Sequence, residues 1–197
     1  VGQELTSILL GLRVVEAAPS VEDARREIGE LREVTANTLE DVRQIAFEMR
    51  PSSLEDLGVG PALERALAIM GQGAGFTPTF RFYNPDDLSL TTAVELGIYR
   101  IVHSALTNIA RHAGAKNVNV TVQVEPGEVS VLVQDDGVGF DAEAVMAGPV
   151  EGRFGILSMQ ERAKIVDGVV SVDSELGVGT TILVRIPRRA ADTHVAE

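Results

Sequence analysis

The stretch from Asp135 to Phe140 reads Asp-Asp-Gly-Val-Gly-Phe and directly follows a run of alternating apolar residues. A carboxylate at the end of a strand can accept a hydrogen bond from an exocyclic amine such as N6 of adenine. Gly137 and Gly139 carry no Cβ and would let the backbone approach a ligand closely. The stretch predicts a binding site with Asp135 as its polar anchor, although an ordinary tight turn would have the same composition.

A second group of candidate residues stands at the end of a long predicted helix. Asn108, Arg111 and His112 are three to four residues apart, so an α-helix would place them on one face. The amide oxygen of Asn108 is a suitable ligand for Mg²⁺, and an arginine can hold phosphate oxygens. The group indicates a metal and phosphate site or, alternatively, a solvated helix face.

Two further glycine-containing segments could contribute to such a site. The segment from Gly152 to Gly155 is predicted to open a helix, where free backbone N–H groups and the helix dipole favour anions. The segment from Gly177 to Thr180 fits a plain hairpin or a further wall of the same pocket. No Gly-x-x-x-x-Gly-Lys-Ser/Thr sequence occurs, which excludes a Walker-type phosphate loop.

An α/β framework is predicted to position these residues. Alternating apolar residues predict strands over residues 76–83, 118–124, 129–133, 169–172 and 181–186. Helical periodicity predicts helices over 91–112 and 156–166. Helices and an antiparallel or mixed sheet in sequence blocks predict a two-layer α/β sandwich.

The segment before this framework is predicted to contain a connector, a short helix and a loop. Residues 54–60 read as a connector with two glycines, and Pro61 suits the first turn of a short helix that continues through Met70. The glycine-rich residues 71–75 are predicted to form a flexible loop.

The N-terminal residues carry narrow apolar stripes that indicate a helical hairpin. Apolar positions recur every three or four residues over 1–15 and again over 21–49, with a break at 17–20 and Ser20 as the N-cap of the second helix. Such a stripe is too narrow to form a core alone, so a dimeric four-helix bundle is the simplest solution. A long helix packed on its own domain is the alternative.

The predicted fold is therefore α+β, with a helical-hairpin dimerisation domain over residues 1–50 and a linker over 51–58. A catalytic α/β domain is expected over 59–188, and a flexible polar tail over 189–197.

The composition narrows the classes of partner. The 197-residue chain is 45% hydrophobic, contains no cysteine and has a formal net charge of −12. The hydrophobic fraction supports a packed core, and the negative charge disfavours nucleic acid and anionic membrane surfaces. The absence of cysteine excludes disulfides and thiolate metal sites and fits a cytosolic protein. No apolar run is long enough to span a bilayer, although a sensor or membrane segment could precede Val1.

Taken in order, the asparagine helix, the Asp-x-Gly-x-Gly stretch, the glycine-rich lid and the Gly-x-Gly-Thr segment resemble the Bergerat ATPases. This group contains histidine kinases, gyrase-type topoisomerases, mismatch-repair ATPases and Hsp-type chaperones, and the resemblance covers 59–187. It implies ATP and Mg²⁺ as ligands, with Asn108 on the metal, Asp135 on adenine, and Arg111 and His112 facing the phosphates. The residues implied to shape the pocket are Gly137, Gly139, Gly152, Gly155 and Thr180, and the segment 141–154 would be a mobile lid.

The N-terminal residues select among these relatives. Residues 1–6 resemble the tail of the phosphoacceptor motif, and 49–54 resemble the linker, of the sensor histidine kinases that pair with LuxR-type response regulators. The resemblance implies a homodimer that transfers the γ-phosphoryl group of ATP to a histidine and then to an aspartate of the regulator. The acceptor histidine would lie just upstream of Val1, so this stretch is not expected to phosphorylate itself. Gln3 matches the glutamine of the subfamily's phosphatase motif, or is a polar residue on the bundle surface.

One residue departs from the family pattern. Ser104 stands four residues before Asn108, where the related ATPases carry a glutamate that acts as the general base for water. A serine hydroxyl cannot hold a proton at neutral pH. The departure predicts ATP binding with slowed turnover. It also supports an alternative function, in which the chain is a regulatory module that binds ATP and docks a response regulator.

Overall fold

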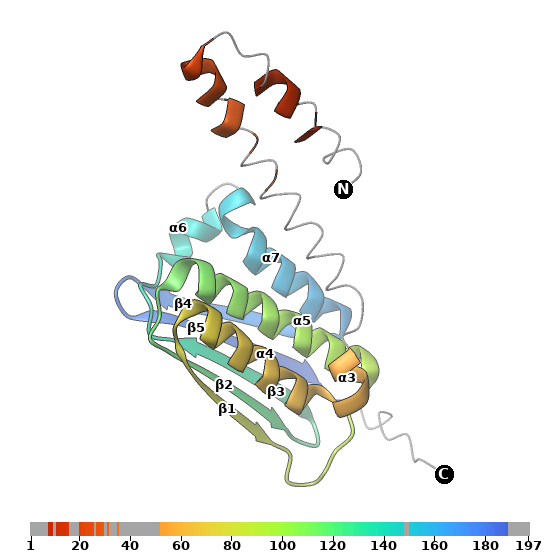
Figure 1. Cartoon of the computed structure of the whole chain (residues 1–197). Coiled ribbons are helices and arrows are strands. Elements are labelled where there is room, and N and C mark those ends of the chain that lie inside the picture. The colour runs from red at the N-terminus through yellow and green to blue at the C-terminus, as the bar shows by residue number, and fades with distance from the viewer. Residues whose placement is uncertain are drawn as a thin grey trace. The chain divides into compact units, whose positions relative to one another are not determined.

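The computed structural model describes residues 8–9, 11–15, 20–25, 27–29, 31, 35, 52–147 and 150–188 (Figure 1). The chain divides into two compact units, Val1–Pro51 and Ser52–Glu197. Within the described residues, no helix has the length and apolar character needed to cross a membrane.

The first unit is helical over 8–9, 11–15, 21–25, 27–29, 31 and 35, and Ser20 is a bend. The predicted N-cap is confirmed, because Ser20 Oγ accepts a hydrogen bond from the backbone N–H of Asp23 at 3.1 Å. A Cβ built on Gly11 would lie 2.6 Å from Leu31 Cδ2, so the two helical segments pack closely. Gln3 and residues 36–50 lie outside the described residues.

The second unit is built on a 5-stranded sheet with the strand order β1-β2-β3-β5-β4. The strands are β1 (Thr77–Tyr83), β2 (Asn117–Val124), β3 (Glu128–Asp135), β4 (Val169–Glu175) and β5 (Gly179–Pro187). The β1 and β2 strands are parallel, and the other neighbouring pairs are antiparallel. The predicted strands are confirmed, with the ends moved by a few residues.

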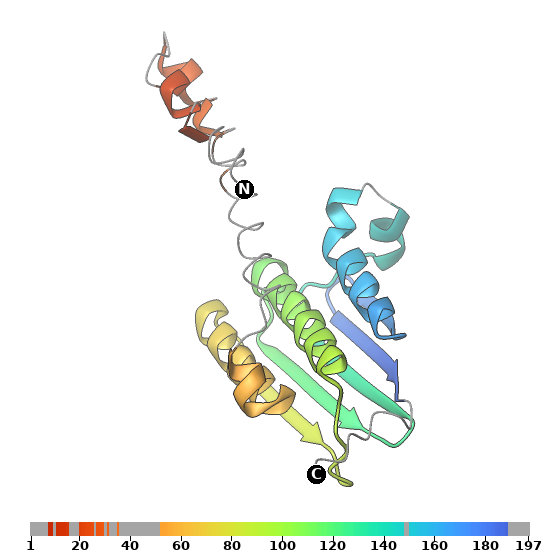
Figure 2. The ribbon, with the colours of Figure 1, turned by 90° about the vertical axis from the view of Figure 1, so that its right-hand side faces the viewer.

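Helices cover one face of this sheet (Figures 1 and 2). They are α3 (Ser52–Leu57), α4 (Val59–Ala74), α5 (Thr92–Asn108), the π-helix η1 (Ile109–Ala113), α6 (Ala142–Ala147) and α7 (Val150–Ile165). The core lies between the two layers, and its fully buried side chains include Leu63, Leu67, Ile98, Ile101, Leu106, Val120, Val131 and Met159. The architecture confirms the predicted two-layer sandwich of α+β type.

The helix-covered sheet face is organised in rows that run across the strands. One row joins Val120, Val133 and Ile182, and the neighbouring row joins Val122, Val131 and Val184. All of these side chains are 5% exposed or less. Such alternation of buried apolar and outward-facing residues fits a sheet with one covered face.

At one end of the face this apolar pattern stops. The last row runs from Val118 through Asp135 and Thr180 to Ser174. Three neighbouring strands therefore present polar side chains, in register, toward the helix layer, which is the arrangement that a ligand site at the edge of a core requires.

The two predicted irregular segments before β1 are wrong. The connector at 54–60 contains α3, because Leu54 is 1% exposed and packs in the core. The loop predicted at 71–75 is the last turn of α4, which ends at Gly75 in the left-handed conformation. Gly71 is buried, and a Cβ on it would lie 3.0 Å from the carbonyl oxygen of Phe76. This glycine permits the close approach of β1, so packing overrides its low helix propensity.

The helix predicted to begin at Ile156 begins at Val150, so Gly152 and Gly155 lie inside α7 and not before it. The segment 141–154, expected as a lid, contains α6 and the first turn of α7. The predicted helix 91–112 also differs. It is α-helical only to Asn108, and η1 follows. Thr91 caps its start by accepting a hydrogen bond from the N–H of Val94 at 3.3 Å.

Candidate nucleotide-binding site

Asp135 ends β3 as a half-buried carboxylate in the polar row. Its Oδ1 accepts a hydrogen bond from the backbone N–H of Gly137 at 2.8 Å. Burial raises the pKa of Asp135 above its ordinary value, while the backbone N–H groups of Gly137 and Thr180 act in the opposite direction. A partly desolvated acceptor at the edge of an apolar core is suited to bind a neutral donor such as an exocyclic amine.

The neighbouring Asp136 has a different environment, although it carries the same group. Its Oδ1 accepts hydrogen bonds from the backbone N–H groups of Lys116 and Asn117 at 2.7 and 2.8 Å, and its Oδ2 accepts one from Asn117 Nδ2 at 2.7 Å. The hydrogen bonds from Asn117 hold the pKa of Asp136 below its usual range. Asp136 therefore fixes the start of β2, and both of its carboxylate oxygens are hydrogen-bonded within the protein.

Glycines of the Asp-x-Gly-x-Gly stretch allow close approach of the protein's own backbone. A Cβ on Gly137 would lie 2.5 Å from the carbonyl oxygen of Ala113. Gly139 has a φ of 58°, and a Cβ there would overlap the carbonyl of Glu175. The N–H of Val138 donates to Ala113 O at 2.8 Å, and the N–H of Gly177 donates to Val138 O at 2.7 Å. The stretch is thus held between the end of η1 and the β4–β5 turn.

Asn108 stands at the point where α5 changes into a π-helix. Its side chain is half-buried, and a Cβ on Gly155 would lie 2.9 Å from Asn108 Nδ2 and 3.1 Å from Asn108 Oδ1. A Cβ at position 155 would force this amide or α7 to shift, so the glycine allows the close approach. Insertions of π geometry often occur at functional sites, and Asn108 at this junction fits that pattern.

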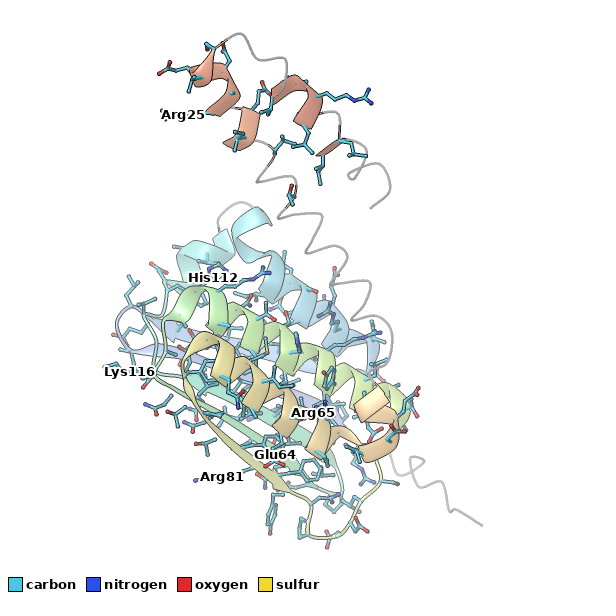
Figure 3. All side chains as sticks on the ribbon, in the orientation of Figure 1. Arg25, Glu64, Arg65, Arg81, His112 and Lys116 are labelled. Carbon is cyan, nitrogen blue, oxygen red and sulfur yellow. The ribbon has the colours of Figure 1, made fainter. Side chains whose placement is uncertain are left out.

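Arg111 and His112 lie in η1 and are exposed. Figure 3 shows His112 at the C-terminal end of the long helix. The wider turn of a π-helix changes the angular spacing on which the predicted common face with Asn108 was based. The three residues share one end of the helix, while Arg111 and His112 are more open to solvent than Asn108.

The remaining predicted site residues lie on β5, α7 and α5. Thr180 pairs with Asp135 across β3 and β5 and is half-buried. Gly152 lies in the first turn of α7, and Ser104 is half-buried on α5. Among the described residues, no three His, Asp or Glu side chains are grouped closely enough to hold a metal ion.

Sequence reasoning missed Ser174 on β4, whose hydroxyl contacts Gly179 and Thr180 on β5 and the backbone N–H of Phe140 at the end of the glycine stretch. Its only signal in the sequence was a polar residue that continues the inward-facing alternation of Val170 and Val172. A polar residue on the buried side of a strand's alternation indicates a candidate site residue.

Comparison with known proteins places both parts of the chain. Residues 93–190 match the family described as histidine kinase-, DNA gyrase B-, and HSP90-like ATPase, and residues 1–54 match the family described as histidine kinase.

Relatives with similar sequences are named as histidine kinases. The chain is 29% identical over 188 residues to the signal transduction histidine-protein kinase/phosphatase DegS of Brevibacillus brevis, covering 94% of the chain and 47% of DegS. It is 29% identical over 185 residues to the oxygen sensor histidine kinase NreB of Staphylococcus carnosus, covering 94% of the chain and 52% of NreB. An uncharacterized sensor-like histidine kinase of Chloroflexus aurantiacus is 34% identical over 178 residues, covering 89% of this chain and 30% of that kinase. The chain thus spans about half or less of each relative.

A solved histidine kinase domain has the same fold. The chain matches the histidine kinase domain of a blue-light activated histidine kinase from Erythrobacter litoralis with a TM-score of 0.51 and 21% identity, covering 66% of this chain and 60% of that domain. Because residues 1–54 and 93–190 match these two family descriptions, the chain belongs to the histidine kinases.

Proposed function

We propose that residues 59–188 bind ATP with Mg²⁺ and form the catalytic domain of a sensor histidine kinase. The single observation that carries this proposal is the row formed by Asp135, Thr180 and Ser174 at the end of an otherwise apolar sheet face. A partly apolar edge with one carboxylate suits adenine, because the base offers a planar apolar surface and an amino donor.

The phosphate end of the nucleotide would lie toward Asn108. Mg²⁺ is usually held by one or two protein ligands together with phosphate oxygens and water, so a single amide oxygen from Asn108 is sufficient. The exposed Arg111 and His112 follow on the same helix end and could contact phosphate oxygens. Gly152 and Gly155 in α7 would contribute backbone close to this end. Catalysis would rest on positioning and on charge neutralisation by the metal.

The first unit would supply the dimer. Leu12 and Ile28 belong to the predicted apolar stripes, and they are 48% and 45% exposed in the single chain. A second copy that completes a four-helix bundle would cover them. The γ-phosphoryl group would pass to a histidine just upstream of Val1 and then to an aspartate of a LuxR-type response regulator in the cytoplasm. Gln3 would position water for the reverse, phosphatase reaction.

A second candidate function is a regulatory module that binds ATP and docks the regulator with impaired kinase activity. Ser104 favours it, because this half-buried position offers a hydroxyl where a carboxylate base is expected. In the full-length protein with its acceptor histidine, Ser104→Glu should raise the rate of autophosphorylation if a missing base limits turnover. An unchanged rate, at unchanged ATP affinity, would contradict that explanation.

Calorimetric titration of this chain with a non-hydrolysable ATP analogue and Mg²⁺ tests the proposed pocket. We expect micromolar affinity that falls by about 10- to 100-fold in Asp135→Asn, since hydrogen bonds to charged groups contribute about 1.5–3 kcal/mol. Asp136→Asn is the matched control and should bind like the wild type, because Asp136 is committed to Lys116 and Asn117. A folded protein without any affinity would overturn the assignment of ATP.

A further inference from the structure

Ser174 lies in the polar row next to the proposed base site. It is directly opposite Thr180 on β5, and Thr180 is directly opposite Asp135 on β3. Directly opposed residues of an antiparallel pair project their side chains to the same face of the sheet. The three polar side chains therefore stand next to one another on the helix-covered face.

The hydroxyl of Ser174 has three polar partners from two segments. It accepts a hydrogen bond from the backbone N–H of Phe140 at 3.0 Å and donates to the carbonyl oxygen of Gly179 at 3.0 Å. Its Oγ also lies 2.9 Å from Thr180 Oγ1, where either hydroxyl could be the donor. Ser174 is half-buried, so these contacts are only partly open to exchange with water.

Counting protons determines the direction of the third contact. A backbone N–H can only donate and a carbonyl oxygen can only accept, whereas a serine hydroxyl has one proton and two acceptor lone pairs. The single proton of Ser174 cannot serve both Gly179 O and Thr180 Oγ1, and one lone pair accepts from Phe140 N–H. All three contacts are satisfied together only if Ser174 donates to Gly179 O and Thr180 donates to Ser174.

A Thr180 hydroxyl that donates to Ser174 has no proton left for a ligand and can only accept hydrogen bonds. Asp135, when ionised, is also an acceptor without a proton. Two adjacent acceptors match a ligand edge that carries N–H donors and disfavour one without them.

We propose that Ser174 is a positioning residue that holds the Thr180 hydroxyl as an acceptor, so that Asp135 and Thr180 together select a purine with an exocyclic amino group. This inference rests on the proposed function, because it assumes that the base of a nucleotide lies at Asp135. Without Ser174, the Thr180 hydroxyl could rotate and donate, and a base without the amino group would be tolerated better.

The test compares ATP with purine riboside triphosphate, which lacks only the 6-amino group of ATP, by titration calorimetry on the full chain with Mg²⁺. The measured quantity is the ratio of the two affinities. In Ser174→Ala we expect the preference for ATP to fall about three- to tenfold, the range that one hydrogen bond contributes. Thr180→Val should lower the ratio as well, and adding Ser174→Ala to Thr180→Val should lower it no further, because Ser174 acts through Thr180.

Ser171→Ala is the matched control. Ser171 lies on the same strand with its exposed side chain on the opposite face, and its Oγ donates to Leu183 O at 3.4 Å. The ratio of the two nucleotide affinities in Ser171→Ala should equal that of the wild type. Circular dichroism should show that all variants are folded.

Different failures separate the two proposals. If the wild type binds neither nucleotide, the proposed function fails and this inference fails with it. If the wild type binds ATP but Ser174→Ala weakens both nucleotides equally or leaves the ratio unchanged, only the role of Ser174 is overturned. Additive effects of Ser174→Ala and Thr180→Val on the ratio would also overturn it, because they would show that Ser174 does not act through Thr180.

Discussion

Val133 and Asp135 lie two residues apart on β3 and face the same side of the sheet, but their rows differ in chemistry. Val133 is 1% exposed between Val120 and Ile182, whereas Asp135 lies half-buried between Val118 and Thr180. The apolar rows stabilise the fold by burying surface, and the polar row keeps groups that can bind a ligand at the edge of that core. The comparison shows that the part of this face that stabilises the fold and the candidate site lie in neighbouring rows of the sheet.

The largest expected effect comes from exchanging valine and threonine, which have the same shape, between the apolar row and the polar row. The quantity compared is the free energy of unfolding. Val131→Thr places a hydroxyl at a position that is 0% exposed and should lower the free energy of unfolding by about 1–3 kcal/mol. Thr180→Val should change it by less than about 1 kcal/mol, because Ser174 keeps Phe140 and Gly179 as partners. Urea denaturation measures both.

The two variants should differ in the opposite way in their affinity for the ATP analogue. Thr180→Val should weaken binding severalfold, and Val131→Thr should leave it unchanged while the protein is folded. Equal losses of stability in the two variants would remove the proposed distinction between the rows.

A Cβ added beside Asn108 should have the next largest effect. Gly155→Ala forces a shift where the added atom would lie 2.9 Å from Asn108 Nδ2, and we expect a destabilisation of about 1 kcal/mol with weaker Mg²⁺-dependent nucleotide binding. Gly73→Ala is the control in α4, where a Cβ would meet no atom within 4 Å. It should stabilise the protein by up to about 0.5–1 kcal/mol by removing a glycine from the last turn of a helix. A gain in stability for both variants would show that Asn108 adjusts freely.

The smallest expected effects are the pH dependences of the two adjacent carboxylates. The pKa of Asp135 is raised from its ordinary 3.8. Its contribution to stability is therefore present below that value and is lost as pH rises through the folded-state pKa. The pKa of Asp136 is lowered from 3.8, so its contribution is present above that value and is lost as pH falls through the folded-state pKa.

Unfolding measured between about pH 2.5 and 6 on the wild type and each asparagine variant tests these signs. As pH rises, the wild type should lose stability relative to Asp135→Asn and gain it relative to Asp136→Asn. The same trend in both pairs would show that the hydrogen bonds of Asp136 and the burial of Asp135 do not govern these groups.

Much of the second unit could be predicted because its signals are local. The valines of β2 and β3 alternate with polar residues, and this period alone predicts two strands with one buried face. The helix propensities of the segments before β1 misled the prediction. Gly71 and Gly73 are helical here because Gly71 is needed where α4 meets Phe76, a contact between segments that no local pattern contains.

The sequence by itself determined the family, the alternation of the strands and the candidate identities of Asp135, Asn108 and Thr180, because residue type and short spacing encode them. Only the tertiary structure showed the different surroundings of the two adjacent aspartates, since the backbone N–H partners of Asp136 are 19 and 20 residues away. It also placed Gly155 against Asn108 and Ser174 beside Thr180. These contacts depend on strand register and helix packing, which bring together segments that are distant in the chain.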